Sequence, residues 1–281
     1  MGNEWRSELA AAIERRFGEK VAIPDDLQGG ETLVRIARHR SMRRYDGRPV
    51  SDELVRLLCA VALSAPSKSD LQQADIVIVR DADKRRTIIE PIADANPWLR
   101  EAPVLLVICG NNHRQREIHR WRGHVFANDH LDPFFNASVD AGIVLATLIV
   151  AAEAAGLGTC SVSAVRNIAA DVAKCLDLPS HAFPVAGLAL GWPAWEGVLS
   201  PRLPLPTTLH VDRHDGTHAR EQVDAYDRRR DSLQPYRTQR DPERFGKVEL
   251  YGWSEDKARQ YAVAERADFG TFVRAKGFRL D

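Results

Sequence analysis

The sequence predicts a globular core in which α-helices and buried β-strands are mixed, and three observations lead to this fold class. Segments with apolar residues at helical spacing interleave with short runs of branched aliphatic residues. The chain has 281 residues, of which 44% are hydrophobic, and this is enough to bury a large core. The 39 Lys and Arg residues balance the 39 Asp and Glu residues, which excludes a histone-like or wholly disordered protein.

The first predicted element is an amphipathic helix over 4–20, because apolar residues recur at helical spacing and Gly18 lies near its C-terminal end. A connector over 24–30 is rich in Pro, Asp and Gly. The next elements are helices and strands in alternation. Helices are predicted over 31–38, 52–64 and 82–94, and strands over 76–79 and 104–108.

The second half of the chain contains one strongly apolar helix, predicted over 137–155, and a helix that is apolar nearly all round is a central one. It follows a polar segment over 111–133. The later elements are a strand near Ser161, a helix over 168–176, a strand over 183–190, and helical stretches over 217–231 and 254–276. We therefore expect an N-terminal helical extension (1–30), a main domain (31–206) and a C-terminal helical tail (207–281).

The N-terminus lacks the basic segment and unbroken apolar run of a signal peptide, so we expect a cytoplasmic protein. The longest apolar stretch, 141–155, is shorter than the ~20 residues of a bilayer span, so no membrane-spanning segment is expected. The four cysteines stand far apart in apolar surroundings, which favours buried reduced thiols over a zinc or redox motif.

Four segments place small, hydroxylated or cationic side chains at the ends of predicted elements. An anionic cofactor would meet backbone amides and fixed positive charge there. Taken singly, each is equally typical of solvated caps and turns. The segments are His39–Arg43, Ala65–Ser69 with Gln72, Ser161–Ala164 with Arg166, and Ser200–Pro204.

Together, and in this order, these segments resemble the flavin-dependent nitroreductase family, in its branch of NADPH-dependent nitro, quinone and flavin reductases. The resemblance spans about 36–206, with a weaker match over 252–278. It implies an α+β fold with a central mixed β-sheet flanked by helices, and an intertwined homodimer with FMN at the subunit interface. It also implies that NADPH, or NADH, reduces FMN, which then passes two electrons to a small aromatic acceptor such as a nitroaromatic, a quinone or free flavin.

The resemblance also implies roles for individual residues. His39, Arg40 and Ser41 would hold the FMN phosphate together with Arg202, and Arg43 would lie by the pyrimidine edge of the flavin and favour its reduced form. Arg166 would help to bind the nicotinamide nucleotide, and no protein side chain is expected to be catalytic because the flavin carries the chemistry. The flavin ring and its ribityl chain would be lined by Ser67, Ser69, Gln72, Asn96, Ser161, Val162, Ser163 and Ala164.

Several positions depart from the family pattern. The residue before Pro201 is usually basic and here is Ser200, and residues 1–30 have no counterpart. The loop over 68–74 is also unusual, with Lys68, Asp70 and no aromatic residue after the glutamine. Two alternatives therefore stay open: a family member with a specialised substrate, as in dehalogenation, dehydrogenation or flavin breakdown, and a non-catalytic flavin-binding regulatory protein.

Two polar segments allow more than one interpretation. The arginine-rich stretch over 228–244 could grip the extra phosphate of NADPH, but its interleaved acidic residues favour a solvated face with salt bridges. The histidine-rich segment over 113–130 matches no metal-ligand spacing, and we expect it to be a mobile cover. Its aromatic candidates for stacking on a flat substrate are Trp121, Phe126, Phe134 and Phe135.

Other functional classes have less support from the residues. No Gly-x-Ser-x-Gly elbow frames a serine, which disfavours a hydrolase, and no Gly-x-Gly-x-x-Gly follows a strand. The neutral charge balance gives no reason to expect a nucleic-acid partner.

Overall fold

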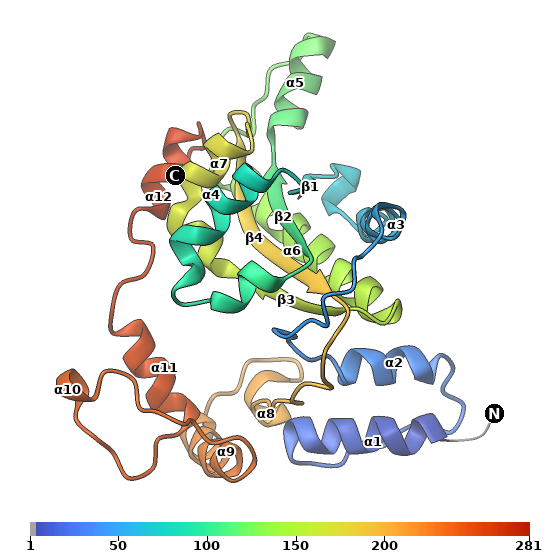
Figure 1. The fold of residues 1–281 in the computed structure, drawn as a ribbon, viewed down its shortest axis with the longest axis vertical. Coiled ribbons are helices and arrows are strands. Elements are labelled where there is room, and N and C mark those ends of the chain that lie inside the picture. The colour runs from blue at the N-terminus through green and yellow to red at the C-terminus, as the bar shows by residue number, and fades with distance from the viewer. Residues whose placement is uncertain (1–3) are drawn as a thin grey trace. The chain divides into compact units, whose positions relative to one another are not determined.

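A computed structural model describes residues 4–281 and has an α+β fold built on one four-stranded sheet (Figure 1). The strands pair in the order β1-β2-β4-β3, and all three pairings are antiparallel. A parallel bridge between Ser41 and Thr159 adds to the edge at β3. We expected a mixed sheet, and in the described residues this bridge is the only parallel pairing. The strands are β1 (Ala74–Ile78), β2 (Val104–Asn111), β3 (Gly158–Val162) and β4 (Ala182–Gly191).

Helices cover both faces of the sheet, and β2 is buried along its whole length. From Val104 to Cys109, its even-numbered residues pack with α3 and α6 and its odd-numbered residues pack with α4 and α7. A strand buried on both faces needs apolar residues at every position, which explains its unbroken aliphatic run. The covering helices are α3 (Asp52–Leu63), α4 (Ala82–Ala93), α6 (Leu131–Ala154) and α7 (Ala169–Cys175).

The central helix α6 is longer than its apolar run. It contains 24 residues and is capped at its N-terminus by His130, whose side chain accepts a hydrogen bond from the backbone of Asp132. Among residues 4–281, α6 is the one helix that is long and apolar enough to cross a membrane, judged by length and composition alone. The expectation that the apolar stretch over 141–155 is too short for a span is corrected, because the helix extends beyond that stretch. The helix contacts all four strands and α3, so it lies in the core of this fold.

The chain forms two units. The first contains residues 4–40 and 198–265, and the second contains 41–197 and 266–281. The three-part division by sequence position stays a prediction. The helices of the first unit are α1 (Glu4–Phe17), α2 (Gly30–Ala37), α8 (Leu205–Thr208), α9 (Ala219–Leu233), α10 (Pro242–Phe245) and α11 (Trp253–Tyr261). The second unit adds α5 (His113–Arg122), α12 (Phe269–Ala275) and the short 3-10 helices η1 (Lys68–Asp70), η2 (Pro97–Glu101) and η3 (Ser163–Ile168).

Two predicted elements differ from the structure. The polar segment after β2 contains α5, which extends away from the sheet (Figure 1) and has no buried residue, so its sequence carries no apolar stripe. The helix predicted over 254–276 is two helices, α11 and α12. Arg266, between them, has a φ of 56°, a left-handed conformation that a continuous helix cannot contain.

All four cysteines are free thiols. Cys59, Cys109 and Cys160 are buried, as predicted, whereas Cys175 is only half-buried. Burial raises the pKa of Cys109 to about 12, so this thiol stays protonated at neutral pH and packs as a small hydrophobic side chain.

The C-terminal residues 266–281 pack at the start of β4. Phe278 and Val273 form a cluster with Phe183, and the Nε2 atom of His181 lies 2.9 Å from the carbonyl oxygen of Gly277. Burial lowers the pKa of His181 below its usual value. The positive charges of Arg116 and His113 lower it further, while the hydrogen bond to Gly277 and the charge of Asp129 oppose them.

We expect His181 to make the free energy of unfolding depend on pH. The unfolded chain binds a proton at His181 near pH 6.5 and the folded chain binds it only at lower pH. The contribution of His181 is therefore present above about pH 6.5 and is lost progressively as the pH falls below that value, through the lower pKa of the folded state. Urea unfolding at several pH values should show a shallower dependence for His181→Gln than for the wild type. His124→Gln, at an exposed histidine, serves as the control. Equal slopes for the wild type and His181→Gln would contradict this account.

Candidate functional site

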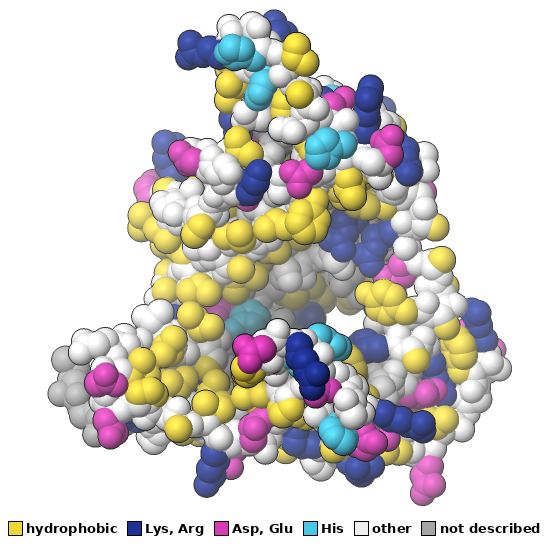
Figure 2. All heavy atoms as spheres, turned by 180° about the vertical axis from the view of Figure 1, so that it is seen from behind, with side chains coloured by type: hydrophobic (Ala, Val, Ile, Leu, Met, Phe, Trp, Pro, Cys, Tyr) yellow, Lys and Arg dark blue, Asp and Glu magenta, His cyan; other side chains and the backbone are white. Residues whose placement is uncertain are grey.

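Two residues expected at the FMN phosphate border one pocket in the first unit. His39 follows α2, Arg202 lies in the segment before α8, and both line a pocket of about 600 Å³. Apart from Arg16, the other walls are apolar and come from α1, α2 and the connector between them. Figure 2 shows hydrophobic side chains gathered over these helices, in the lower left of the view. Cationic residues from distant parts of the sequence are thus brought to one place.

In the second unit, backbone pairing places Ser41 beside β3. Ser41 forms a bridge with Thr159, and the backbone N–H of Met42 donates to the carbonyl of Thr159 at 2.7 Å. The buried Met42 side chain packs over Gly158, where a Cβ atom would lie 2.5 Å from its Cγ. Glycine at this position therefore lets the segment after Arg40 lie against the strand that carries Ser161.

Beside this bridge, β3 and the start of η3 present small side chains to the surface. Ser161 and Ser163 are exposed, whereas Val162 between them is buried. Arg43, also exposed, has its guanidinium carbon 5.9 Å from the ring centre of Trp98. Burial raises the pKa of Cys160, and the charge and hydrogen bond of Arg43 oppose that rise. Arg43 therefore holds a fixed positive charge next to β3.

The loop that carries Ser67, Ser69 and Gln72 has a strained backbone. Ser69, Asp70 and Gln72 have φ values of 52°, 56° and 51°, a region that residues other than glycine rarely adopt. Within the loop, the backbone N–H of Gln72 donates to Ser67 Oγ at 3.1 Å, and its side-chain amide donates to Asp70 Oδ1 at 3.1 Å. Such conformations persist only where the surroundings enforce them, and they concentrate at functional sites.

Asp140 on α6 enforces this conformation from below the loop. Its Oδ1 accepts from the backbone N–H of Lys68 at 3.0 Å, and its Oδ2 accepts from the backbone N–H of Gln73 at 3.1 Å. The side chain is buried, with 1% of the residue exposed. The predicted site residues did not include Asp140, although a carboxylate within a strongly apolar helix was a visible signal. The central helix α6 therefore holds both ends of the loop over 68–73.

The same loop borders a pocket of about 480 Å³ in the second unit. Ser67, Gln72 and Asp140 line it, and Arg114 and Asp75 add further polar groups to the lining. Arg114 forms an ion pair with Asp75 and donates to the carbonyl of Gln72 at 2.6 Å. Hydroxyl, amide and guanidinium groups thus converge on one concave surface, as binding sites for small polar ligands require.

Two further predicted site residues are anchored to nearby backbone. The side-chain amide of Asn96 donates to the carbonyl of Ile92 at 3.1 Å, at the end of α4. The guanidinium of Arg166 donates to the carbonyl of Val185 in β4. Both residues are half-buried. Their roles toward flavin and nicotinamide stay predictions.

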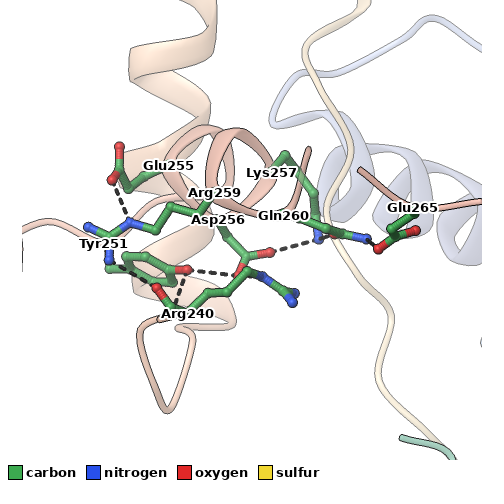
Figure 3. A network of polar contacts seen from close by, with 8 residues as sticks. All are labelled: Arg240, Tyr251, Glu255, Asp256, Lys257, Arg259, Gln260 and Glu265. Atoms are coloured by element: carbon green, nitrogen blue, oxygen red, sulfur yellow. Dashed lines mark hydrogen bonds and ion pairs between the residues drawn. The ribbon is translucent and has the colours of Figure 1, made fainter. Parts of the chain in front are cut away.

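Two arginines of the tail, Arg240 and Arg259, belong to a polar network in the first unit (Figure 3). Buried Arg259 donates to the carbonyls of Arg240 and Gly246 at 3.1 and 2.9 Å. Buried Asp256 accepts from the hydroxyl of Tyr251 at 2.9 Å and lies 3.5 Å from Nε of Arg240. These contacts favour a structural role for Arg240 in a salt-bridged surface over a role in binding the NADPH phosphate. A grip on NADPH by the other tail arginines stays a prediction.

Of the four aromatic residues predicted to stack on a substrate, two pack instead against other rings of the protein. Phe134 packs on Phe183, with ring centres 4.7 Å apart, and Phe126 packs on His119 at 5.1 Å. Trp121 and Phe135 are exposed. Within residues 4–281, no three His, Cys, Asp or Glu side chains come together as metal ligands would.

Similarity to known proteins identifies the family. The nitroreductase family model matches residues 36–192, and the model of the family's C-terminal domain matches residues 200–281. This chain belongs to the nitroreductase family. The match confirms the resemblance inferred from the residues.

Individual relatives match over almost their whole length. The FMN reductase [NAD(P)H] of Bacillus subtilis (strain 168) is 30% identical over 256 residues, which are 89% of this chain and 99% of that protein. The NADPH-flavin oxidoreductase of Vibrio harveyi is 28% identical, over 88% of this chain and 97% of its own. Among solved structures, B. megaterium NfrA2 has a TM-score of 0.80 at 28% identity and covers 89% of this chain and 99% of its own. The predicted nitroreductase fold is therefore confirmed.

Proposed function

We propose that this nitroreductase-family chain is an FMN-dependent NAD(P)H oxidoreductase that reduces nitroaromatics, quinones or free flavin in two-electron steps. The observation that carries the proposal is the full-length similarity to relatives named FMN reductase and NADPH-flavin oxidoreductase. The residues present also fit such a cofactor. His39 and Arg202 border one pocket, and Asp140 holds the serine-bearing loop in a strained conformation.

When bound, FMN supplies the redox chemistry: it accepts a hydride from the nicotinamide and passes electrons to the acceptor. The chain's own residues bind and orient. Arg202 and Arg40 neutralise the phosphate, as cations at such a dianion do, and His39 helps to hold it. Ser41 adds a hydroxyl donor beside β3. No side chain is needed as a proton donor or nucleophile in this proposal.

The remaining site residues act on the flavin ring and the nicotinamide. Arg43 places a fixed guanidinium at the pyrimidine edge, where it stabilises the charge that builds up on reduction. Ser67, Ser69, Gln72 and Asn96 contact the ring or the ribityl chain. The small residues Ser161, Val162, Ser163 and Ala164 leave room for a planar ring, and Arg166 contacts the nicotinamide nucleotide, which we propose to be NADPH in preference to NADH.

The proposal includes a cytoplasmic homodimer. Large apolar side chains are exposed on the helices, including Leu33 and Ile36 on α2 and Leu57 and Val61 on α3, and a second copy of the chain would cover them. The neutral charge balance supports the absence of a nucleic-acid partner. The packing of α6 against the whole sheet supports the absence of a membrane partner.

Steady-state kinetics test the proposed reaction. With FMN-loaded protein, NADPH and NADH are each varied against a nitroaromatic, a quinone and free FMN. We expect faster oxidation of NADPH than of NADH. Parallel double-reciprocal lines are also expected, because donor and acceptor react in turn. Failure of the FMN-loaded protein to oxidise either nucleotide with any acceptor would exclude the proposed reaction.

One observation favours a specialised acceptor as a second candidate. The loop over 68–74 carries Lys68 and Asp70, and it borders the polar pocket of about 480 Å³ beside Arg114. In that case FMN is reduced rapidly by NADPH, but reoxidation by every acceptor of the panel is slow. A regulatory flavoprotein would instead retain oxidised flavin in the presence of both nucleotides.

A further inference from the structure

The N-terminal helix α1 contributes a buried arginine to the two segments that carry the proposed phosphate-binding residues. Arg16 lies outside both family matches, which cover residues 36–192 and 200–281, and only 6% of it is exposed. Its Nε donates to the carbonyl of Ala37 at 3.0 Å, its Nη1 donates to the carbonyl of Ser200 at 2.7 Å, and its Nη2 donates to the carbonyl of His39. One guanidinium thus joins the end of α2 to the segment before Arg202.

Backbone contacts complete this junction. The N–H of Arg202 donates to the carbonyl of Arg16 at 2.6 Å. The guanidinium of Arg229 on α9 donates to the carbonyls of Arg16 and Arg202 at 3.0 and 2.6 Å. Because the backbone on both sides of Pro201 is fixed to α1, the position of Arg202 depends on a helix that the family matches do not include.

Arg16 also brings a charge to this segment. The residue before Pro201 is the uncharged Ser200, and its carbonyl accepts directly from Arg16. A buried guanidinium is weakly screened by solvent, so its field acts over a few ångströms on an anion held by its neighbours. Arg16 therefore places positive charge beside the segment in which the side chain of residue 200 provides none.

We propose that Arg16 is a positioning residue for the FMN phosphate: it fixes the backbone of His39 and of Ser200–Arg202 and places a positive charge beside Ser200. The inference rests on the proposed function, since it concerns the same cofactor. Arg16 acts through its neighbours and need not touch the phosphate. Its loss should therefore weaken the binding of FMN and leave riboflavin, which has the same ring but no phosphate, largely unaffected.

The test is a flavin titration of the full-length apoprotein, in which the quenching of flavin fluorescence reports binding. For Arg16→Met we expect the dissociation constant for FMN to rise about tenfold or more, as expected when charge-assisted hydrogen bonds are lost, and that for riboflavin to change less than about twofold. Arg16→Lys keeps the charge but not the three-way fork, so its FMN affinity should lie between those of Arg16→Met and the wild type. Arg6→Met is the matched control, because Arg6 lies on the same helix and donates to the carbonyls of Pro24 and Asp25.

The outcomes separate this inference from the proposed function. Unchanged FMN affinity in Arg16→Met, or equal losses for FMN and riboflavin, would overturn the positioning role. If Arg16→Met does not fold, Arg16→Lys decides, since it must show a loss selective for FMN. A wild-type apoprotein that binds neither flavin would instead refute the proposed function, and the role of Arg16 with it.

Discussion

Replacing Arg202 by alanine is expected to raise the dissociation constant for FMN about a hundredfold. A guanidinium paired with a phosphate makes hydrogen bonds that are both charge-assisted and geometrically matched, and losing such a partner costs about 1.5–3 kcal/mol. Arg202 is exposed and lines the same pocket as His39, so its substitution removes one of the cations expected at the phosphate. Fluorescence titration of the apoprotein with FMN measures the effect.

Riboflavin and a second arginine provide the controls for Arg202→Ala. Riboflavin affinity should stay close to that of the wild type, because the substitution removes a partner of the phosphate alone. Arg213→Ala removes an equal charge from an exposed position in the same unit and should leave the affinity for FMN within about twofold of the wild type, since screened surface charges contribute little. Wild-type FMN affinity in Arg202→Ala would remove this residue from the phosphate site.

Asp140→Asn is expected to lower the free energy of unfolding by about 3 kcal/mol. The carboxylate accepts hydrogen bonds from the backbone of Lys68 and Gln73, and an amide can accept at only one of these positions while it turns an N–H toward the other. The loop between them contains three residues with positive φ, and with weaker anchoring this strained conformation is no longer enforced. Urea unfolding of the apoprotein measures the change.

Asp132→Asn is the control for Asp140→Asn on the same helix. Asp132 is exposed and accepts from the side chain of Asn136 at 2.7 Å, so its substitution should change the free energy of unfolding by only about 0.5 kcal/mol. We also expect Asp140→Asn to weaken binding of both FMN and riboflavin, since the serine-bearing loop serves the ring. Equal stability of the two variants would contradict the anchoring role of Asp140.

Local sequence pattern predicts most of the elements because burial leaves a periodic signature. The uninterrupted aliphatic residues of β2 predict a strand covered on both faces, and α3 and α6 cover one of those faces. The sequence pattern did not predict an element correctly where the element has no buried residues, or where the backbone conformation of one residue ends a helix. Helix α5 has no buried residue and so no apolar stripe, and the left-handed conformation of Arg266 interrupts a pattern that reads as one helix.

The candidate site was predictable only as far as its residues form local motifs. The segment around His39 to Arg43 is such a motif, and so is the serine-bearing loop around Ser67. Asp140 and Arg16 act instead on backbone groups that are 67 and 184 residues away in sequence, on Gln73 and on Ser200. Nothing in the neighbouring sequence of either residue specifies these partners, because folding alone brings the groups together.

The most direct test of the account is the visible absorbance of the purified full-length chain, loaded with FMN and titrated with NADPH without oxygen. We predict one bound FMN per chain, loss of the absorbance of the oxidised flavin after about one equivalent of NADPH, and its return when a quinone is added. A protein that cannot be loaded with FMN, or a bound flavin whose spectrum neither NADPH nor NADH alters, would contradict the account.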